Sequence, residues 1–301
     1  MPVMMLSKCR VRALSRLLVA FAAAGCLSTS AQAAEDLKTG GPYVPTPQVV
    51  VDQMLRFANV GEKDFVIDLG SGDGVIVLTA AKQYKASGMG VDIDADLVRK
   101  SNESARKLGL SDRARFEQLD VFKADLGKAS VLTLYLLPGM MINLRSKIFN
   151  ELKPGVRVVS HDYHFGGDWS PDDQIRFDVP EKEAINGVPS ATVYLWHVPA
   201  KIAGKWEIKV AGGGSYELAI KQRFQSVEAS VTAAAGNPLQ PQGLALRGAN
   251  FSFALPDGKG IARFAGRVKD DAMEGTVELP GARTSARWSA VRTVAGAVTT
   301  E

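Results

Sequence analysis

The chain has 301 residues and a formal net charge of +4, with 36 Lys and Arg against 32 Asp and Glu. The first 33 residues hold four basic and no acidic side chains, so the rest of the chain carries 32 of each sign. This balance lacks the basic excess of a nucleic-acid-binding protein, and we expect no nucleic-acid partner. The length allows one large domain or two smaller ones.

The N-terminal segment has the pattern of a secretory signal peptide, residues 1–33. Basic residues are followed by an apolar run at 17–27, and Ala31 and Ala33 give a small-x-small cleavage site. The run is too short to span a membrane stably, and no second one approaches that length. We therefore expect an exported, periplasmic protein without stable membrane insertion. Lipoprotein anchoring at Cys26 is disfavoured because Ala23 stands where leucine is usual.

A buried strand followed by a glycine-rich turn is predicted early in the mature chain. Residues 66–69 are mostly apolar and suit a central parallel strand covered on both faces. Gly70, Gly72 and Gly74 then allow a tight turn and a close approach of the backbone to a ligand. The spacing is G-x-G-x-G, whereas dinucleotide-binding turns have G-x-G-x-x-G. Together with Asp73 inside the turn, this disfavours a nicotinamide oxidoreductase.

Two aspartates lie at the end of the second predicted strand, which spans residues 89–94. Asp92 lies twenty residues beyond Gly72, at the carboxyl end of that strand. A carboxylate there can accept hydrogen bonds from both ribose hydroxyls of a nucleoside. Asp94 is interpreted as the N-cap of the next helix, although either aspartate can serve both purposes.

Strands and helices alternate up to residue 200. The expected strands are 66–69, 89–94, 114–119, 130–136 and 156–160 with a hairpin at 175–179 and 191–198, and the expected helices are 48–58, 75–84, 95–108 and 140–152. This rhythm predicts an α/β fold with a doubly wound, mainly parallel seven-stranded sheet. Ligands of such sheets bind beyond the carboxyl ends of the strands.

The character of the sequence changes after residue 200. Short segments of alternating polarity are separated by Gly and Pro turns, and no helical period persists. This pattern predicts a small antiparallel β domain at 203–292, either a sandwich or a barrel. Residues 34–200 are then the first domain, and 293–301 are expected to form a flexible tail.

Four segments carry a family resemblance: 43–47 (YVPTP), 68–74 (DLGSGDG), 90–92 (GVD) and 135–141 (YLLPGMM). With them, residues 42–169 resemble class I S-adenosylmethionine (SAM) methyltransferases. More narrowly, they resemble the lysine methyltransferases of the ATP synthase c-subunit type, distant relatives of the Dot1-type histone methyltransferases. The resemblance implies a Rossmann-like methyltransferase fold and SAM as the cofactor.

The resemblance also implies roles for single residues. The glycine turn would hold the methionine part of SAM, with Asp68 near its amino group. Asp120 and Val121 would frame the adenine, although Asp120 can also be a simple turn residue. Tyr43 and Thr46 either strap the core or close over the cofactor. The complete expected cofactor set is Tyr43, Thr46, Asp68, Gly70, Ser71, Gly72, Gly74, Asp92, Ile93, Asp120 and Val121.

The methyl acceptor is predicted from the segment after the fourth strand. Enzymes of this fold that methylate base amines carry Asp/Asn-Pro-Pro-Tyr/Phe there, but this chain has YLLP at 135–138. The absence of the polar acceptor favours an aliphatic amine such as lysine. Tyr135 either orients that amine or is a core aromatic, and a base can come from His161, Asp162 or His164. No metal site is expected, because no further His or Cys ligand is evident nearby.

The sequence thus predicts a SAM-dependent methyltransferase that acts on a protein lysine or a small amine. The alternative is a non-catalytic SAM- or nucleoside-binding envelope protein whose β domain binds a partner. The predicted export signal supports this alternative, because SAM is made in the cytoplasm.

Overall fold

The computed structural model describes residues 41–233, 236, 238–256 and 260–300. The chain divides into two units, Met1–Tyr43 and Val44–Glu301, and every element described below belongs to the second. The predicted signal peptide lies outside the described residues. Among the residues described, no helix is long and apolar enough to cross a membrane.

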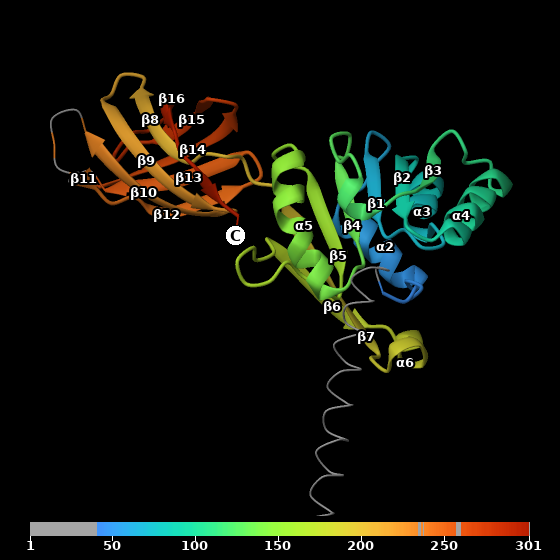
Figure 1. Ribbon diagram of the computed structural model, residues 1–301. Coiled ribbons are helices and arrows are strands. Elements are labelled where there is room, and N and C mark those ends of the chain that lie inside the picture. The colour runs from blue at the N-terminus through green and yellow to red at the C-terminus, as the bar shows by residue number, and fades with distance from the viewer. Residues whose placement is uncertain (1–40, 234–235, 237, 257–259, 301) are drawn as a thin grey trace, which may run out of the picture. The chain divides into compact units, whose positions relative to one another are not determined.

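A seven-stranded sheet forms the core of the first domain (Figure 1). Its strands are β1 (Phe65–Leu69), β2 (Ser87–Asp92), β3 (Ala114–Gln118), β4 (Val131–Leu134), β5 (Arg157–His161), β6 (Asp173–Asp178) and β7 (Ser190–His197). Their order is β3-β2-β1-β4-β5-β7-β6, and only β7 runs antiparallel to its neighbours. The predicted doubly wound, mainly parallel sheet is therefore confirmed.

Helices cover both faces of this sheet (Figure 1). They are α2 (Gln48–Phe57), α3 (Val75–Tyr84), α4 (Ala95–Lys107) and α5 (Pro138–Glu151), with a short α6 (Glu181–Asn186) in the β6–β7 connection. Ile67 packs with Leu144 and Ile148 of α5, whereas Val66 belongs to the core of Val51 and Ile76 from α2 and α3. Successive strand residues point to opposite faces, so a strand covered on both sides is a continuous apolar run. Burying each such side chain stabilises the folded state by about 1.5–3 kcal/mol relative to leaving it exposed.

The second domain is a ten-stranded β sheet. Its strands are β8 (Gly204–Val210), β9 (Ser215–Arg223), β10 (Ser226–Ala233), β11 (Pro238–Leu239), β12 (Gln242–Arg247), β13 (Asn250–Pro256), β14 (Ile261–Lys269), β15 (Ala272–Glu278), β16 (Ala286–Ala295) and β17 (Val298–Thr299). The main path is β11-β10-β9-β8-β16-β15-β14-β13-β12, with antiparallel neighbours throughout. Because β10 and β12 also contact each other, the sheet curls toward closure, as the sequence predicts.

Alternating apolar residues fill the interior of this sheet. Trp206, Phe253, Phe264 and Trp288 are all buried there, and the rings of Phe253 and Phe264 stack 4.6 Å apart. The end of the chain differs from the expected flexible tail at 293–301. Strand β16 runs to Ala295, and the two residues of β17 pair in parallel with β9. A two-residue strand can pair through its main chain with almost any side chains, so the pattern of apolar and polar residues does not predict β17.

The junction after β7 is built on a buried glutamine. Gln222, which is 4% exposed, accepts hydrogen bonds from the amides of Ile202 and Ala203 at 2.7 and 3.1 Å. Its amide nitrogen donates to the carbonyl oxygens of Ala200 and Phe224 at 2.8 and 2.7 Å. All its hydrogen-bonding groups are therefore used, as a buried amide requires.

Candidate active site

The ends of five strands bring the predicted site residues to one edge of the sheet. In the order β3-β2-β1-β4-β5, the parallel strands end near Asp120, Asp92, Gly70, Tyr135 and His161 respectively. Parallel neighbours end on the same side, so residues from distant parts of the sequence converge there. The sequence predicts that Gly70–Gly74, Asp92, Asp120 and Tyr135 lie at strand carboxyl ends, and the strand order brings those ends together. Their roles toward a ligand stay predictions.

The glycine turn after β1 has a backbone that other residues tolerate poorly. Gly70, Gly72 and Gly74 have φ values of 76°, 52° and 82°, in the left-handed region. A Cβ on Gly70 would lie 2.6 Å from Cδ2 of Leu136, and one on Gly74 would lie 2.6 Å from Cζ of Phe116. The turn is therefore packed on the protein side and leaves its backbone close to any ligand at the strand ends.

Asp92 ties the glycine turn to the end of β2. One carboxylate oxygen accepts the amide of Gly72 at 2.8 Å, and the other accepts the amide of Asp94 at 3.0 Å. Carboxylate oxygens have further lone pairs, so both can still accept hydrogen bonds from ribose hydroxyls. Asp94 caps α4 by accepting the amides of Asp96 and Leu97 at 2.8 and 3.1 Å, which confirms its predicted N-cap role.

Asp68 is a buried carboxyl group near the end of β1. It is 2% exposed, and the hydroxyl of Thr133 donates a hydrogen bond to it at 2.6 Å. Burial raises its pKa to about 7, against the lowering by the Thr133 bond, and the nearby Asp92 and Asp73 raise it further. A cationic amino group beside Asp68 would relieve this cost, so the position suits the ammonium of a bound amino acid.

Serine side chains complete the inner wall of the turn. Ser101 of α4 donates a hydrogen bond to the carbonyl oxygen of Gly72 at 3.0 Å. The Ser71 hydroxyl is buried and has no partner within the described part of the chain. A buried hydroxyl without a partner is unusual. The left-handed backbone of the glycine turn, the Asp92 carboxylate and this hydroxyl together fit the amino-acid and ribose parts of SAM.

An aromatic cluster lies at the ends of β4 and β5. The Tyr135 ring lies 4.1 Å from that of fully buried His161 and stacks 6.2 Å from Tyr163, which is 36% exposed. Burial raises the pKa of Tyr135 to about 12, helped by Asp162 and Tyr163, so its hydroxyl keeps its proton. Burial lowers the pKa of His161 to about 4, so its ring is uncharged at neutral pH.

Sequence reasoning missed two buried polar residues of this edge. Thr133 faces Asp68, and Lys182 of α6, which is 1% exposed, pairs with Asp162. A threonine in a strand and a lysine in a short polar helix carry no sequence signal that separates them from ordinary residues. Only the threonine's place in an otherwise apolar strand could have drawn attention to it.

Asp120, Val121 and Ile93 follow strands that end at this edge, and their roles, like that of Thr46, stay predictions. Asp120 caps the short helix Val121–Lys123 by accepting the amide of Phe122 at 3.0 Å. Val121 is buried, Ile93 is 48% exposed and Thr46 is half-buried. Tyr43 is exposed and belongs to the separate unit Met1–Tyr43, so its closure over the cofactor stays a prediction.

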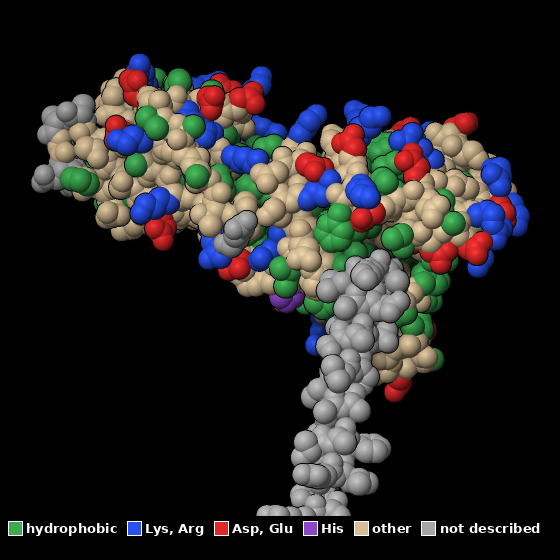
Figure 2. Space-filling view, in the orientation of Figure 1, with side chains coloured by type: hydrophobic (Ala, Val, Ile, Leu, Met, Phe, Trp, Pro, Cys, Tyr) green, Lys and Arg blue, Asp and Glu red, His purple; other side chains and the backbone are tan. Residues whose placement is uncertain are grey.

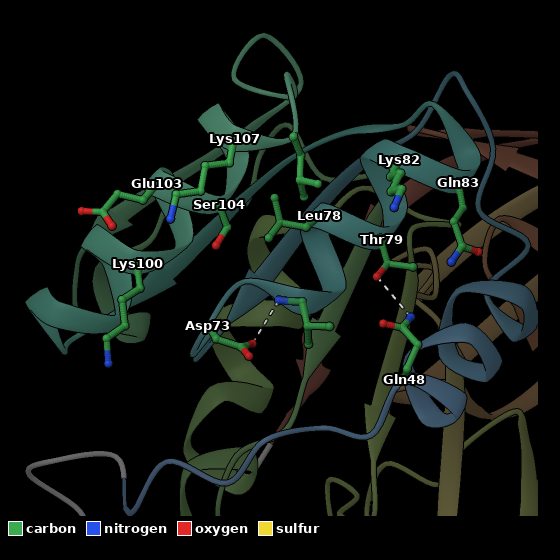
Figure 3. Close-up of a pocket in the computed structure, with 12 residues that line it drawn as sticks. Gln48, Asp73, Leu78, Thr79, Lys82, Gln83, Lys100, Glu103, Ser104 and Lys107 are labelled. Carbon is green, nitrogen blue, oxygen red and sulfur yellow. Dashed lines mark hydrogen bonds between the residues drawn. The ribbon is translucent and has the colours of Figure 1, made fainter.

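A groove of about 580 Å³ lies elsewhere, along the outer sides of α3 and α4 (Figure 3). Its lining includes Lys82 and Lys100, and the Gln48 amide reaches Thr79 across it at 3.2 Å. None of the strand-end residues except Asp73 borders it, so it is not the site described above. Figure 2 shows basic and acidic side chains interspersed over this region, without a patch of one sign on the visible face.

Residues 68–173 match the family model of the ANTKMT methyltransferase domain. The chain is 39% identical over 156 residues to a protein-lysine N-methyltransferase of Saccharolobus islandicus (strain REY15A), covering 52% of this chain and 92% of that relative. It is 32% identical over 132 residues to the ATP synthase c-subunit lysine N-methyltransferase of Xenopus laevis, covering 44% of this chain and 57% of that relative. The chain therefore spans little more than half of the Xenopus protein.

A similar solved structure is an RNA methyltransferase from Salinibacter ruber in complex with S-adenosyl-L-homocysteine. It is 45% identical, with a TM-score of 0.48, and the match covers 53% of this chain and 96% of that chain.

The family match contains the glycine turn, Asp92, Asp120 and Tyr135, which are the residues that the sheet brings to one edge. The relative from Saccharolobus is matched over almost its whole length. SAM is thus the cofactor, and the chain belongs to the protein-lysine N-methyltransferase family.

Proposed function

We propose that the chain transfers the methyl group of SAM to the ε-amine of a lysine in a protein. The observation that carries the proposal is the adjacency of β1 and β4. It places the glycine turn against Leu136, next to Tyr135 and the aromatic cluster. The glycine turn, which would bind the cofactor, and the apolar and aromatic side chains after β4 and β5 then lie at one edge of the sheet. Such surroundings suit a long aliphatic side chain.

The residues contribute mainly binding and orientation. Bound SAM supplies a methyl group on a positively charged sulfur, so no nucleophilic side chain is needed. The glycine turn and Asp92 would hold the donor, and Tyr135 would orient the uncharged acceptor amine. Positioning two reactants and excluding water account for much of the rate in such a transfer.

A nucleic-acid acceptor is disfavoured by the same site. The segment after β4 lacks the polar Asp or Asn that accepts a base-amine proton, and apolar Leu136 packs against the glycine turn. The two relatives named above act on protein lysines, as their names state. These observations support a protein acceptor.

The first experiment uses the mature chain, residues 34–301, shown to be folded by circular dichroism. Calorimetric titration with SAM and S-adenosylhomocysteine should show saturable binding of both. Labelled SAM should then place label on envelope proteins, and mass spectrometry should find it on lysine. Absence of binding would end the proposal. Binding without transfer would favour the non-catalytic module, and label on a small amine would replace the protein acceptor.

Export is a second part of the proposal and is supported by the pattern of residues 1–33. A reporter enzyme that is active only outside the cytoplasm, fused after residue 40, should be active in cells. Replacing Ala31 and Ala33 with bulky residues should prevent cleavage of the leader. An inactive reporter with the unaltered leader would show that the chain works in the cytoplasm.

A further inference from the structure

A buried ion pair lies behind the acceptor side of the site. The Nζ atom of Lys182 donates a hydrogen bond to Oδ2 of Asp162 and another to the carbonyl oxygen of Ser190, the latter at 2.7 Å. The other oxygen of Asp162 accepts the amide of Thr192 at 3.0 Å. A lysine that is 1% exposed needs such partners, because an unpaired buried charge is very costly.

The ion pair fixes a strained turn at the end of β5. Asp162 has a φ of 59°, in the left-handed region that costs residues other than glycine about 1 kcal/mol or more. Its amide donates to the carbonyl oxygen of Thr192 at 2.7 Å, and the Ser160 hydroxyl donates to the carbonyl oxygen of Tyr163. Together these bonds orient His161 on one side of Asp162 and Tyr163 on the other.

His161 is the group that this turn places under Tyr135. Its ring is fully buried, and neither nitrogen has a hydrogen-bond partner among the described residues. Nε2 lies 3.4 Å from Oδ2 of Asp162, without the alignment of a hydrogen bond. The titratable groups around it are Tyr135 from the end of β4, Asp162 and Tyr163 after β5, and Lys182 from α6.

We propose that Lys182 is a positioning residue for the methyl acceptor: by holding Asp162, it fixes His161 beneath the Tyr135 ring that faces the acceptor lysine. The inference rests on the proposed lysine methylation. Lys182 also neutralises the Asp162 carboxylate, which would otherwise favour protonation of His161. An imidazolium in contact with Tyr135 would repel the cationic side chain that has to enter the site.

The matched variants are Lys182→Met, which removes the charge and keeps the length, and Lys147→Met. Lys147 pairs with Glu151 on α5 at 2.7 Å and lies outside the site, so it controls for the loss of a lysine. The chain has three histidines, so proton NMR of the cofactor-free protein can follow each imidazole. Burial, with Lys182 adding to its effect, lowers the pKa of His161, while Asp162 raises it.

In the unaltered protein, one histidine should not titrate between about pH 5 and pH 8. In Lys182→Met, the unpaired Asp162 should raise the pKa of His161 and bring its titration into that range. The double variant Lys182→Met/Asp162→Asn removes both charges, so His161 should again not titrate between about pH 5 and pH 8. An unchanged histidine titration in Lys182→Met would overturn the inference. If that variant does not fold, Lys182→Gln, which removes the charge but keeps a donor for the carbonyl oxygen of Ser190, makes the same test with the same two outcomes.

Kinetics separate positioning from general structure. Lys182→Met should lower kcat/KM for the acceptor by about tenfold or more, with SAM affinity unchanged, because small errors in the placement of reacting groups are costly in rate. Lys147→Met should change neither. Equal losses of SAM affinity and transfer would indicate a merely structural role and overturn the inference. If the unaltered protein methylates no lysine, the proposed function fails, and the NMR comparison still decides whether Lys182 controls His161.

Discussion

Asp92 holds the glycine turn against the end of β2 and is predicted to bind the ribose of SAM, and a substitution tests that prediction. Its carboxylate accepts the amides of Gly72 and Asp94 at 2.8 and 3.0 Å, and the family resemblance implies that it also binds the ribose. We expect Asp92→Ala to weaken SAM binding by about 1.5–3 kcal/mol, or roughly tenfold to more than a hundredfold. Calorimetry measures this change. Asp94→Ala is the control, since it removes a helix cap without removing the ribose carboxylate, and equal losses in both would remove Asp92 from the site.

Asp68 makes a pH dependence of cofactor binding testable. Burial raises its pKa to about 7, far above the ordinary value of 3.8. Between about pH 4 and pH 7, the Asp68 carboxyl group is protonated in the folded, cofactor-free protein but ionised in the unfolded chain. The contribution of Asp68 to stability is therefore highest below about pH 4 and falls as pH rises toward 7. The resemblance places the ammonium of SAM beside Asp68, and that cation favours the ionised carboxylate.

SAM binding at about pH 6 should therefore release a proton, and affinity should rise with pH until about 7.5. Calorimetry in buffers of different ionisation enthalpy counts the proton. Asp68→Asn should bind more weakly and show neither the proton release nor the pH dependence. Proton release that persists in this variant would assign it to another group.

The residues at this edge show what the sequence can predict and what it cannot. Asp94 was predicted as a cap and Asp92 as the strand-end carboxylate, because each role follows from distance along the chain to a neighbouring element. Lys182 and Thr133 were missed because their roles depend on which strands become neighbours. Tyr135 and His161 were chosen as candidates, but their ring contact is a product of the β4–β5 register.

The same reasoning holds for whole elements. The sheet, its hairpin and the helices follow from apolar periodicity, so the sequence predicted them with small errors at the ends. Helix α6 and strand β17 were missed, since both are short and depend on contacts from the folded core. The start of α3 is different, because a local glycine requirement and a tertiary contact act there together.

Gly74, at the N-terminus of α3, tests whether the backbone conformation and the tertiary contact both require glycine. It has a φ of 82°, and an added Cβ would lie 2.6 Å from Cζ of Phe116 and 3.0 Å from Cβ of Ser101. Gly109 follows α4 with a φ of 67° but has no atom within 4 Å of the built Cβ. Gly109→Ala should lower the free energy of unfolding by about 1–2 kcal/mol, the cost of the left-handed backbone alone. Gly74→Ala should lower the free energy of unfolding by about 1–3 kcal/mol more than Gly109→Ala, because its Cβ overpacks the site, and urea denaturation measures both losses. Equal losses would show that Phe116 moves aside without cost.

At the scale of the whole molecule, the first domain takes part of its core from a turn of the second sheet. Phe224, between β9 and β10, is fully buried in the same cluster as residues of α5. Its ring stacks 4.8 Å from Trp169 and meets Phe149 edge-on at 5.5 Å. Gln222 fixes the backbone next to it through its bond to the Phe224 carbonyl oxygen, at 2.7 Å. The predicted boundary near residue 200 is thus a boundary between sheets, and the apolar core crosses it.

This shared core predicts that a substitution in the second sheet destabilises the methyltransferase domain. Phe224→Ala should lower the free energy of unfolding by about 3–5 kcal/mol, because it leaves a cavity beside Trp169. Urea unfolding followed by tryptophan fluorescence measures the loss, and Phe122→Ala is the control for an aromatic side chain that is 37% exposed. SAM affinity under folding conditions should stay unchanged, since Phe224 packs against Trp169 and Phe149 and contacts none of the residues predicted to bind the cofactor. A loss no larger than that of Phe122→Ala would mean that the two sheets fold as independent units.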